Sequence, residues 1–315
     1  MRLIDKVVNS PPQVERPDAA GLMHTVAGVG AKSPAIKKCA LRYILDPAAS
    51  DECMKLLTSA NNGLLDPGNP LLRFPAETFW LEWFGTTAEH PKWGVLVEAE
   101  HDGRCGRLTV FFQDEFGRAD TVGASIEFDL DGVAPSASTS NFRIQHDTYL
   151  HLNPLLACAS GRLGPDWDRY FRTRPAEEYR RNLADLAQYC WHLLPMTCAF
   201  SAMLNSVDIL TEAPSDLERL NAARVRRGRE PLLDHIEVSI RLGQARNSLA
   251  RSGQLRTKSS PRLHHVRGHF VHRAGKTFWR SPHLRGDVKK PIVQKTVLVH
   301  GSRLGSTTGG RRYAI

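Results

Sequence analysis

The chain has 315 residues, enough for two domains, and its 41% of hydrophobic residues is an ordinary share for a protein with a buried core. No stretch approaches the roughly 18 consecutive apolar residues of a membrane helix, so we expect no membrane contact. Residues 1–9 are too charged for a secretory signal, and the six scattered cysteines form no C-x-x-C pair. These features predict a cytoplasmic protein with reduced thiols.

The net charge of +9 is distributed very unevenly. Residues 1–240 contain 25 Lys and Arg against 32 Asp and Glu, whereas residues 241–315 contain 17 Lys and Arg against one acid, Asp287. A solvated basic surface normally includes acids that limit self-repulsion. We therefore predict that the C-terminal quarter binds a polyanion, above all RNA. An acidic protein partner and a disordered basic tail are the alternatives.

In the first third of the chain we expect a poorly ordered N-terminal lead-in segment followed by helical structure. Residues 1–35 contain several prolines and little periodicity, which is typical of a poorly ordered segment. Residues 35–57 favour a helix that breaks near Pro47.

Residues 74–131 predict an antiparallel meander of four strands, because segments dense in aromatic and β-branched residues alternate with turn signals. The acids of this region could be mistaken for catalytic carboxylates. They stand at alternating positions, however, so we expect Glu82, Glu98 and Glu100 to face solvent.

The central region has a helical period. Apolar residues from Tyr179 to Leu194 recur at helical spacing after Thr173, a candidate cap, and Pro175, and Pro195 should end or kink this helix. They therefore predict a core-facing stripe that includes Cys190.

Two further elements follow the long helix. Ser215 and Glu218 have the spacing of a capping box, which predicts a helix that ends at Gly228. Residues 235–242 alternate strictly, as in a half-buried strand with His235 on the solvent face.

These elements predict an α+β fold: an N-terminal antiparallel β-meander with helices, a central helical segment, and a small basic C-terminal β-hairpin or sheet. Residues 36–245 would form a partner-recognition domain, residues 246–260 a basic linker, and residues 261–315 a cationic β module rich in His and Arg.

The β module combines cations with aromatic rings. Lys and Arg neutralise phosphates, guanidinium groups bind phosphate in a forked manner, and exposed rings stack on unpaired bases. The alternative for the rings is that they form the module's own core. The nucleic-acid-binding residues that we predict are Arg262, His264, Arg267, His269, His272, Arg273, Lys276, Trp279, Arg280, His283 and Arg285.

The histidines of this module leave three roles open. RNA cleavage without a metal needs a base, an acid and a cation, and on a regular strand His265, Arg267 and His269 share one face. A metal site is not expected, because no cysteine lies nearby, Asp287 is the only acid and the Arg charge opposes a divalent ion. We predict no cofactor. Structural or phosphate-binding histidines are the alternative to catalysis.

The same residues resemble a known family. The family is that of a type V-A anti-CRISPR protein and its phage and plasmid relatives. Its C-terminal signature is P-H-x-R-R-G-H-W, followed by a glycine turn and a basic-aromatic strand, and this segment of the chain is similar to it. The matching positions are His264, Arg267, Gly268, His269 and Phe270, and Arg280-Ser281-Pro282 resembles the later Trp-x-Pro stretch. The sequence departs from the signature at His265 and Val266, and Phe270 replaces Trp.

This resemblance implies a mobile-element protein that acts during translation in the cytoplasm of a bacterial host. It would engage RNA or a ribosome–nascent-chain complex and lower expression of a host-defence target. Two alternatives stay open: a metal-independent ribonuclease that uses His265, Arg267 and His269, and an inhibitor that docks on an acidic host protein.

Overall fold

The computed structural model describes residues 2–18, 20–59, 63–100, 103–132, 142–206 and 209–240, together with the backbone of four short C-terminal strands. The chain divides into two units, residues 1–241 with 270–279 and residues 242–269 with 280–315. None of the described helices is long and apolar enough to cross a membrane.

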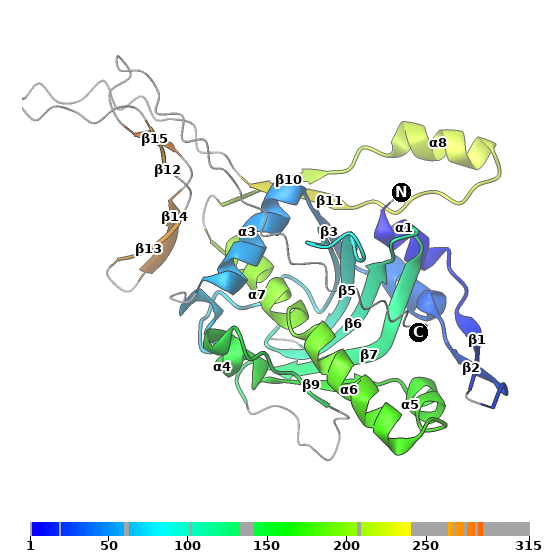
Figure 1. Cartoon of the computed structure of the whole chain (residues 1–315). Helices are drawn as coiled ribbons and strands as arrows, with labels where there is room; N and C mark the ends of the chain where they lie inside the picture. The colour runs from blue at the N-terminus through cyan, green and yellow to red at the C-terminus, as the bar shows by residue number, and fades with distance from the viewer. Residues whose placement is uncertain are drawn as a thin grey trace, which may run out of the picture. The chain divides into compact units, whose positions relative to one another are not determined.

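The first unit is built on a mixed sheet of nine strands, so the predicted α+β class is confirmed (Figure 1). In sheet order the strands are β10 (Leu210–Pro214), β11 (Ile236–Ile240), β3 (Leu41–Leu45), β4 (Thr78–Phe84), β5 (Lys92–Ala99), β6 (Cys105–Gln113), β7 (Ala119–Asp129), β9 (Ala159–Leu163) and β8 (Phe142–Arg143). Strand β3 is parallel to both β11 and β4, and all other neighbours are antiparallel. The predicted meander corresponds to β4–β7.

The described helices are α1 (Leu3–Val8), α2 (Ser33–Lys38), α3 (Pro47–Thr58), α4 (Asn153–Leu156), α5 (Pro165–Phe171), α6 (Ala176–Cys190), α7 (Leu193–Leu204) and α8 (Glu218–Arg226), with 3-10 turns η1 (Val29–Lys32), η2 (Gly63–Leu65) and η3 (Leu150–Leu152). Helices α3 and α7 pack on one face of the sheet, and α1 and α2 pack on the other. A separate hairpin is formed by β1 (Gln13–Pro17) and β2 (Met23–Ala27).

Strand β4 is buried on both faces. Its successive side chains point alternately into two separate core clusters, one on each side of the sheet. Phe79, Leu81 and Trp83 belong to the large cluster that contains buried residues of α3 and α7. Trp80 faces the other way and packs with Leu3 and other residues of α1 and α2. The Trp80 indole lies over Gly94 of β5, where a Cβ atom would come within 2.4 Å of the ring. Only glycine therefore fits beneath this tryptophan.

Glu82 shares the inner face with Trp80, which corrects the prediction that it faces solvent. Its side chain is about 1% exposed, and its two oxygens accept the backbone N–H groups of Leu3 and Ile4 at 2.9 and 3.0 Å. Lys92 Nζ lies 3.6 Å from the same carboxyl group. Burial raises the pKa of Glu82, while the two N–H donors and Lys92 act to lower it. The carboxyl group thus satisfies free donors at the start of α1.

The prediction of a poorly ordered lead-in is wrong for residues 1–35. This segment contains α1, the β1–β2 hairpin and η1, and Leu3, Ile4 and Val7 are fully buried. The prediction of a helix over residues 35–57 is wrong for Leu41–Leu45, which form β3 between two parallel neighbours. In both cases, partners far along the chain decide the structure.

Helix α6 buries the apolar stripe that the sequence predicts, since Cys190 is buried and Tyr179 and Leu183 pack against the main core. Pro175 occupies the N-cap position and no side chain caps the helix, since the Thr173 hydroxyl donates to the Tyr170 carbonyl at 2.7 Å. The helix ends at Cys190, earlier than predicted, and Pro195 lies in the first turn of α7, where its missing N–H is tolerated.

The region before β11 brings two corrections. Ser215 does not cap α8: its hydroxyl accepts the N–H of His235 at 3.0 Å, and the helix begins at Glu218 without a side-chain cap. His235 is about 6% exposed, not on a solvent face, and contacts the guanidinium of Arg2 at 3.0 Å. Gly228 ends α8 as predicted, with φ +66°.

We expect Glu82→Ala to lower the free energy of unfolding by about 3 kcal/mol, because two buried N–H groups lose their acceptor and Lys92 loses its partner. Urea denaturation measures this loss. Glu82→Gln keeps one acceptor oxygen and should cost less. Glu98→Ala is the control, since the half-exposed Glu98–Lys32 pair (2.9 Å) contributes under about 1 kcal/mol. Equal losses for Glu82→Ala and Glu98→Ala would contradict the anchoring role.

Candidate functional site

The C-terminal module is described by the backbone of four strands in two pairs. Strand β12 (His264–Val266) pairs antiparallel with β15 (His283–Arg285), so that His264 stands opposite Arg285 and Val266 opposite His283. Strand β13 (His269–Arg273) pairs with β14 (Lys276–Arg280).

Most of the predicted nucleic-acid-binding residues fall on these strands, while Arg262 and Arg267 lie outside the described residues. Strand β12 ends at Val266 and β13 begins at His269, so His265 and His269 belong to different strand pairs. We expected His265, Arg267 and His269 to share one face because we assumed that they lie on one continuous strand, and the break between β12 and β13 removes that assumption. Their catalytic role stays a prediction, because their side chains lie outside the described part.

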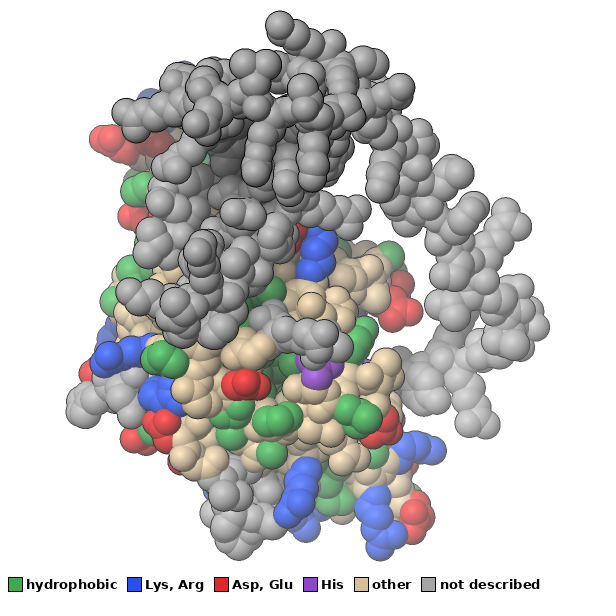
Figure 2. Space-filling model, turned by 90° about the vertical axis from the view of Figure 1, so that its left-hand side faces the viewer, with side chains coloured by type: hydrophobic (Ala, Val, Ile, Leu, Met, Phe, Trp, Pro, Cys, Tyr) green, Lys and Arg blue, Asp and Glu red, His purple; other side chains and the backbone are tan. Residues whose placement is uncertain are grey.

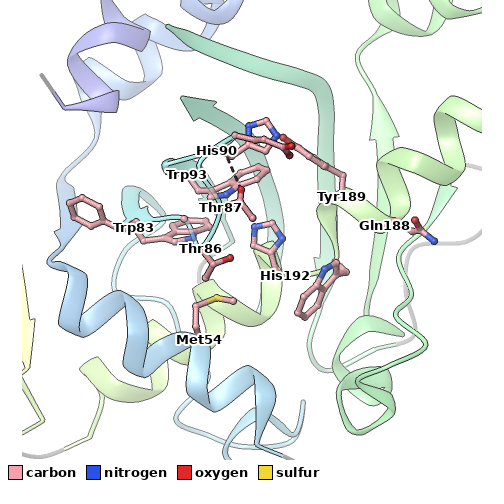
Figure 3. A pocket seen from close by; sticks show the side chains of 13 residues that line it. Met54, Trp83, Thr86, Thr87, His90, Trp93, Gln188, Tyr189 and His192 are labelled. Carbon is pink, nitrogen blue, oxygen red and sulfur yellow. Dashed lines mark hydrogen bonds between the residues drawn. The ribbon is translucent and has the colours of Figure 1, made fainter. Parts of the chain in front are cut away.

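Within the first unit, a pocket lies between the β4–β5 loop and the junction of α6 and α7. Its volume is about 270 Å³. Figure 3 shows Trp83, Met54 and His192 around one space, with Gln188 directed away from it. The lining is largely aromatic: Met54, Trp83, Phe84, Gly85, Thr86, Thr87, Glu89, His90, Trp93, Gln188, Tyr189, Trp191 and His192.

A tight loop holds one wall of this aromatic pocket. The N–H of Gly85 donates to the Pro91 carbonyl at 3.0 Å, and a Cβ atom at Gly85 would lie 1.9 Å from the His90 carbonyl oxygen. The N–H of His90 donates to the Thr87 hydroxyl at 3.4 Å (Figure 3). Glycine at position 85 is therefore needed for the loop to close.

Two imidazoles pack edge-on against the aromatic rings. The His90 ring centre lies 4.8 Å from Phe112 and 5.1 Å from Tyr189, and the His192 ring centre lies 4.7 Å from Trp93. Burial lowers the pKa of His192 to about 4, and it also lowers the pKa of His90. Both rings are therefore neutral near pH 7, and Nδ1 of His90 is buried without a hydrogen-bond partner among the described atoms.

The imidazoles of this pocket and the neighbouring thiol are uncharged near pH 7. An imidazole with a pKa near 4 is a weak base. Burial raises the pKa of the neighbouring Cys190 thiol to about 12, which leaves it protonated. In the described ranges, no group of His, Cys, Asp and Glu is placed to hold a metal ion. Aromatic side chains make up much of the wall and the two imidazoles are neutral, and such walls are typical of sites for an apolar or aromatic group.

The surface around this unit mixes both signs of charge. On the described face turned to the viewer in Figure 2, blue and red side chains alternate with small groups of hydrophobic ones. Comparison with protein-family models, with curated proteins and with solved structures gave no match.

Sequence reasoning missed the aromatic pocket. Its signals were present, because Trp83 and Trp93 flank a loop and Tyr189, Trp191 and His192 cluster at a helix break. The helical stripe and the strand pattern assigned these residues to the core, and periodicity alone does not show where a core opens to solvent.

We expect the stability of the protein to fall as pH drops from 6.5 to about 4, in part through His192. The unfolded imidazole takes up a proton in this window and the folded one does not, so protonation favours unfolding. Urea midpoints across the window for the protein and for His192→Gln measure this contribution. The variant should show a shallower fall, and an identical pH profile would contradict the neutral, buried state of His192.

Proposed function

We propose that this protein is a regulatory protein of a mobile genetic element, similar to anti-CRISPR proteins, that engages RNA or a translating ribosome through its basic C-terminal module. It would lower the expression of a host-defence target. The observation that carries the proposal is the charge division: 17 Lys and Arg against one acid after residue 240, and an excess of acids before it. Such a segment binds phosphates by releasing their counterions.

The first unit would recognise the partner in this proposal. Residues 1–240 carry an excess of acids, so their summed charge attracts RNA less than the module does, and the aromatic pocket fits a single apolar or aromatic side chain of a protein. In this proposal the module is the main RNA-binding segment, and the pocket of the first unit is the site for the protein partner.

The test is a filter-binding titration with single-stranded RNA over a salt series. The module variant combines Arg262→Gln, Arg267→Gln, Arg273→Gln and Arg280→Gln. If these side chains contact four phosphates, the slope of log affinity against log salt should fall by about 3. The control removes the same charge from the exposed residues Arg143, Arg169, Arg180 and Arg181. Equal slopes for the module variant and the unaltered protein would overturn the proposal.

The same experiment separates the alternatives. Intact RNA after prolonged incubation removes the ribonuclease hypothesis, whereas cleavage that His269→Ala abolishes would favour it. Partners that stay bound after nuclease treatment of a pull-down, with no RNA affinity in the titration, would favour a protein-binding inhibitor.

A further inference from the structure

Helix α8 lies on an extended arm and buries none of its own residues, although Leu233 and His235 on the returning segment pack against the first unit. Strands β10 and β11 pair up to Pro214 and Ile236, and the chain between them leaves the sheet and returns (Figure 1). No residue of α8 is buried, and Leu220 and Val225 are about half exposed. Long connections whose exposed parts do not pack on the core are usually functional.

Polar contacts hold the arm in a defined shape. Asn221 bonds the returning segment twice: its Nδ2 donates to the Leu232 carbonyl at 3.0 Å, and its Oδ1 accepts the Leu232 N–H at 2.7 Å. Arg224 Nε donates to the Glu230 carbonyl at 2.9 Å. Paired backbone bonds around Gly228 close the C-terminus of the helix. A nine-residue helix is marginal on its own, so these contacts fix its orientation.

The face of α8 opposite these contacts is basic. At 100° per residue, Asn221 and Arg224 point to the returning segment, while Arg219, Ala222, Ala223 and Arg226 fall on the other side. Arg227 adjoins this arginine face at the end of the helix. Arg219, Arg226 and Arg227 are exposed, and among the described residues no carboxylate pairs with them. The small alanines between Arg219 and Arg226 leave room for a ligand backbone.

The helix dipole explains only part of this pattern. It favours cations in the last turn, where Arg224 and Arg226 lie, and acids near the start, where Glu218 lies. It does not explain Arg219 in the first turn. Arg219 and Arg226 are two turns apart, about 10 Å along the axis, so they can contact separate phosphates of one strand.

We propose that the arginine face of α8 is a second RNA-binding surface, which contacts phosphates independently of the C-terminal module. This inference rests on the proposed function, since it assumes that RNA is the ligand. Guanidinium groups suit phosphate because they bind it in a forked, two-point manner.

The arm variant Arg219→Gln, Arg226→Gln, Arg227→Gln tests this proposal in the full chain. We expect RNA affinity to drop roughly tenfold at low salt and the salt slope to fall by about 2. The matched control is Arg169→Gln, Arg180→Gln, Arg181→Gln, which removes the same charge from α5 and α6. Thermal unfolding should be unchanged in both, because surface substitutions of this kind stay within about 0.5 kcal/mol.

The outcomes distinguish this inference from the proposed function. If the module variant loses RNA and the arm variant matches the control, only the arm proposal falls. If the unaltered protein does not bind RNA, or if the arm captures an acidic protein after nuclease treatment, RNA is not the ligand of the arm. Ala223→Glu is a second check, since an acid inside the arginine face should weaken binding while Ala184→Glu on α6 should not.

Discussion

The fold depends on burying both faces of β4 at once. Phe79, Leu81 and Trp83 need cover from α3 and α7, and Trp80 needs cover from α1. A sheet whose central strand is apolar on both sides is stable only between two layers. The first residues of the chain must therefore fold back onto the sheet, and Glu82 marks where they attach by binding the backbone N–H groups of Leu3 and Ile4. A single buried carboxyl group thus links the N-terminus to the middle of the chain.

The limits of sequence reasoning follow from this arrangement. The meander was predictable because its strands are consecutive and their turns carry local signals. Strand β3 was not, because its partners are β4 and β11, the latter almost two hundred residues away. Helix α1 was missed for the same reason: Leu3 and Ile4 gain their stability from Trp80, Leu96 and Phe111. The alternation of residues along β4 showed that Glu82 lies on the opposite face from Leu81 and Trp83. It gave no information on whether that face is exposed to solvent.

The same limit applies to the candidate sites. Charge along the chain could be counted, so the basic module was identifiable from composition alone. The aromatic pocket required three-dimensional proximity, since it joins the loop after Trp83 to the break at His192. The arginine face of α8 was predictable only in part. Its arginines are evident in the sequence, but only the bonds of Asn221 to Leu232 show which side of the helix is free.

Cations in the sheet unit often have a carboxylate a few residues away, whereas most cations of the C-terminal quarter do not. Many ion pairs of the sheet unit are local, as in Arg2–Asp5, Arg118–Asp114 and Arg172–Asp168, three or four residues apart. Such pairs add little stability, but they keep the field of each cation short-ranged. Between residues 238 and 286 the sequence contains no carboxylate at all, so pairs of the local kind are limited there to the two ends, beside Glu237 and Asp287. In the proposed function, the closely spaced negative charges of an RNA backbone would relieve the mutual repulsion of these cations.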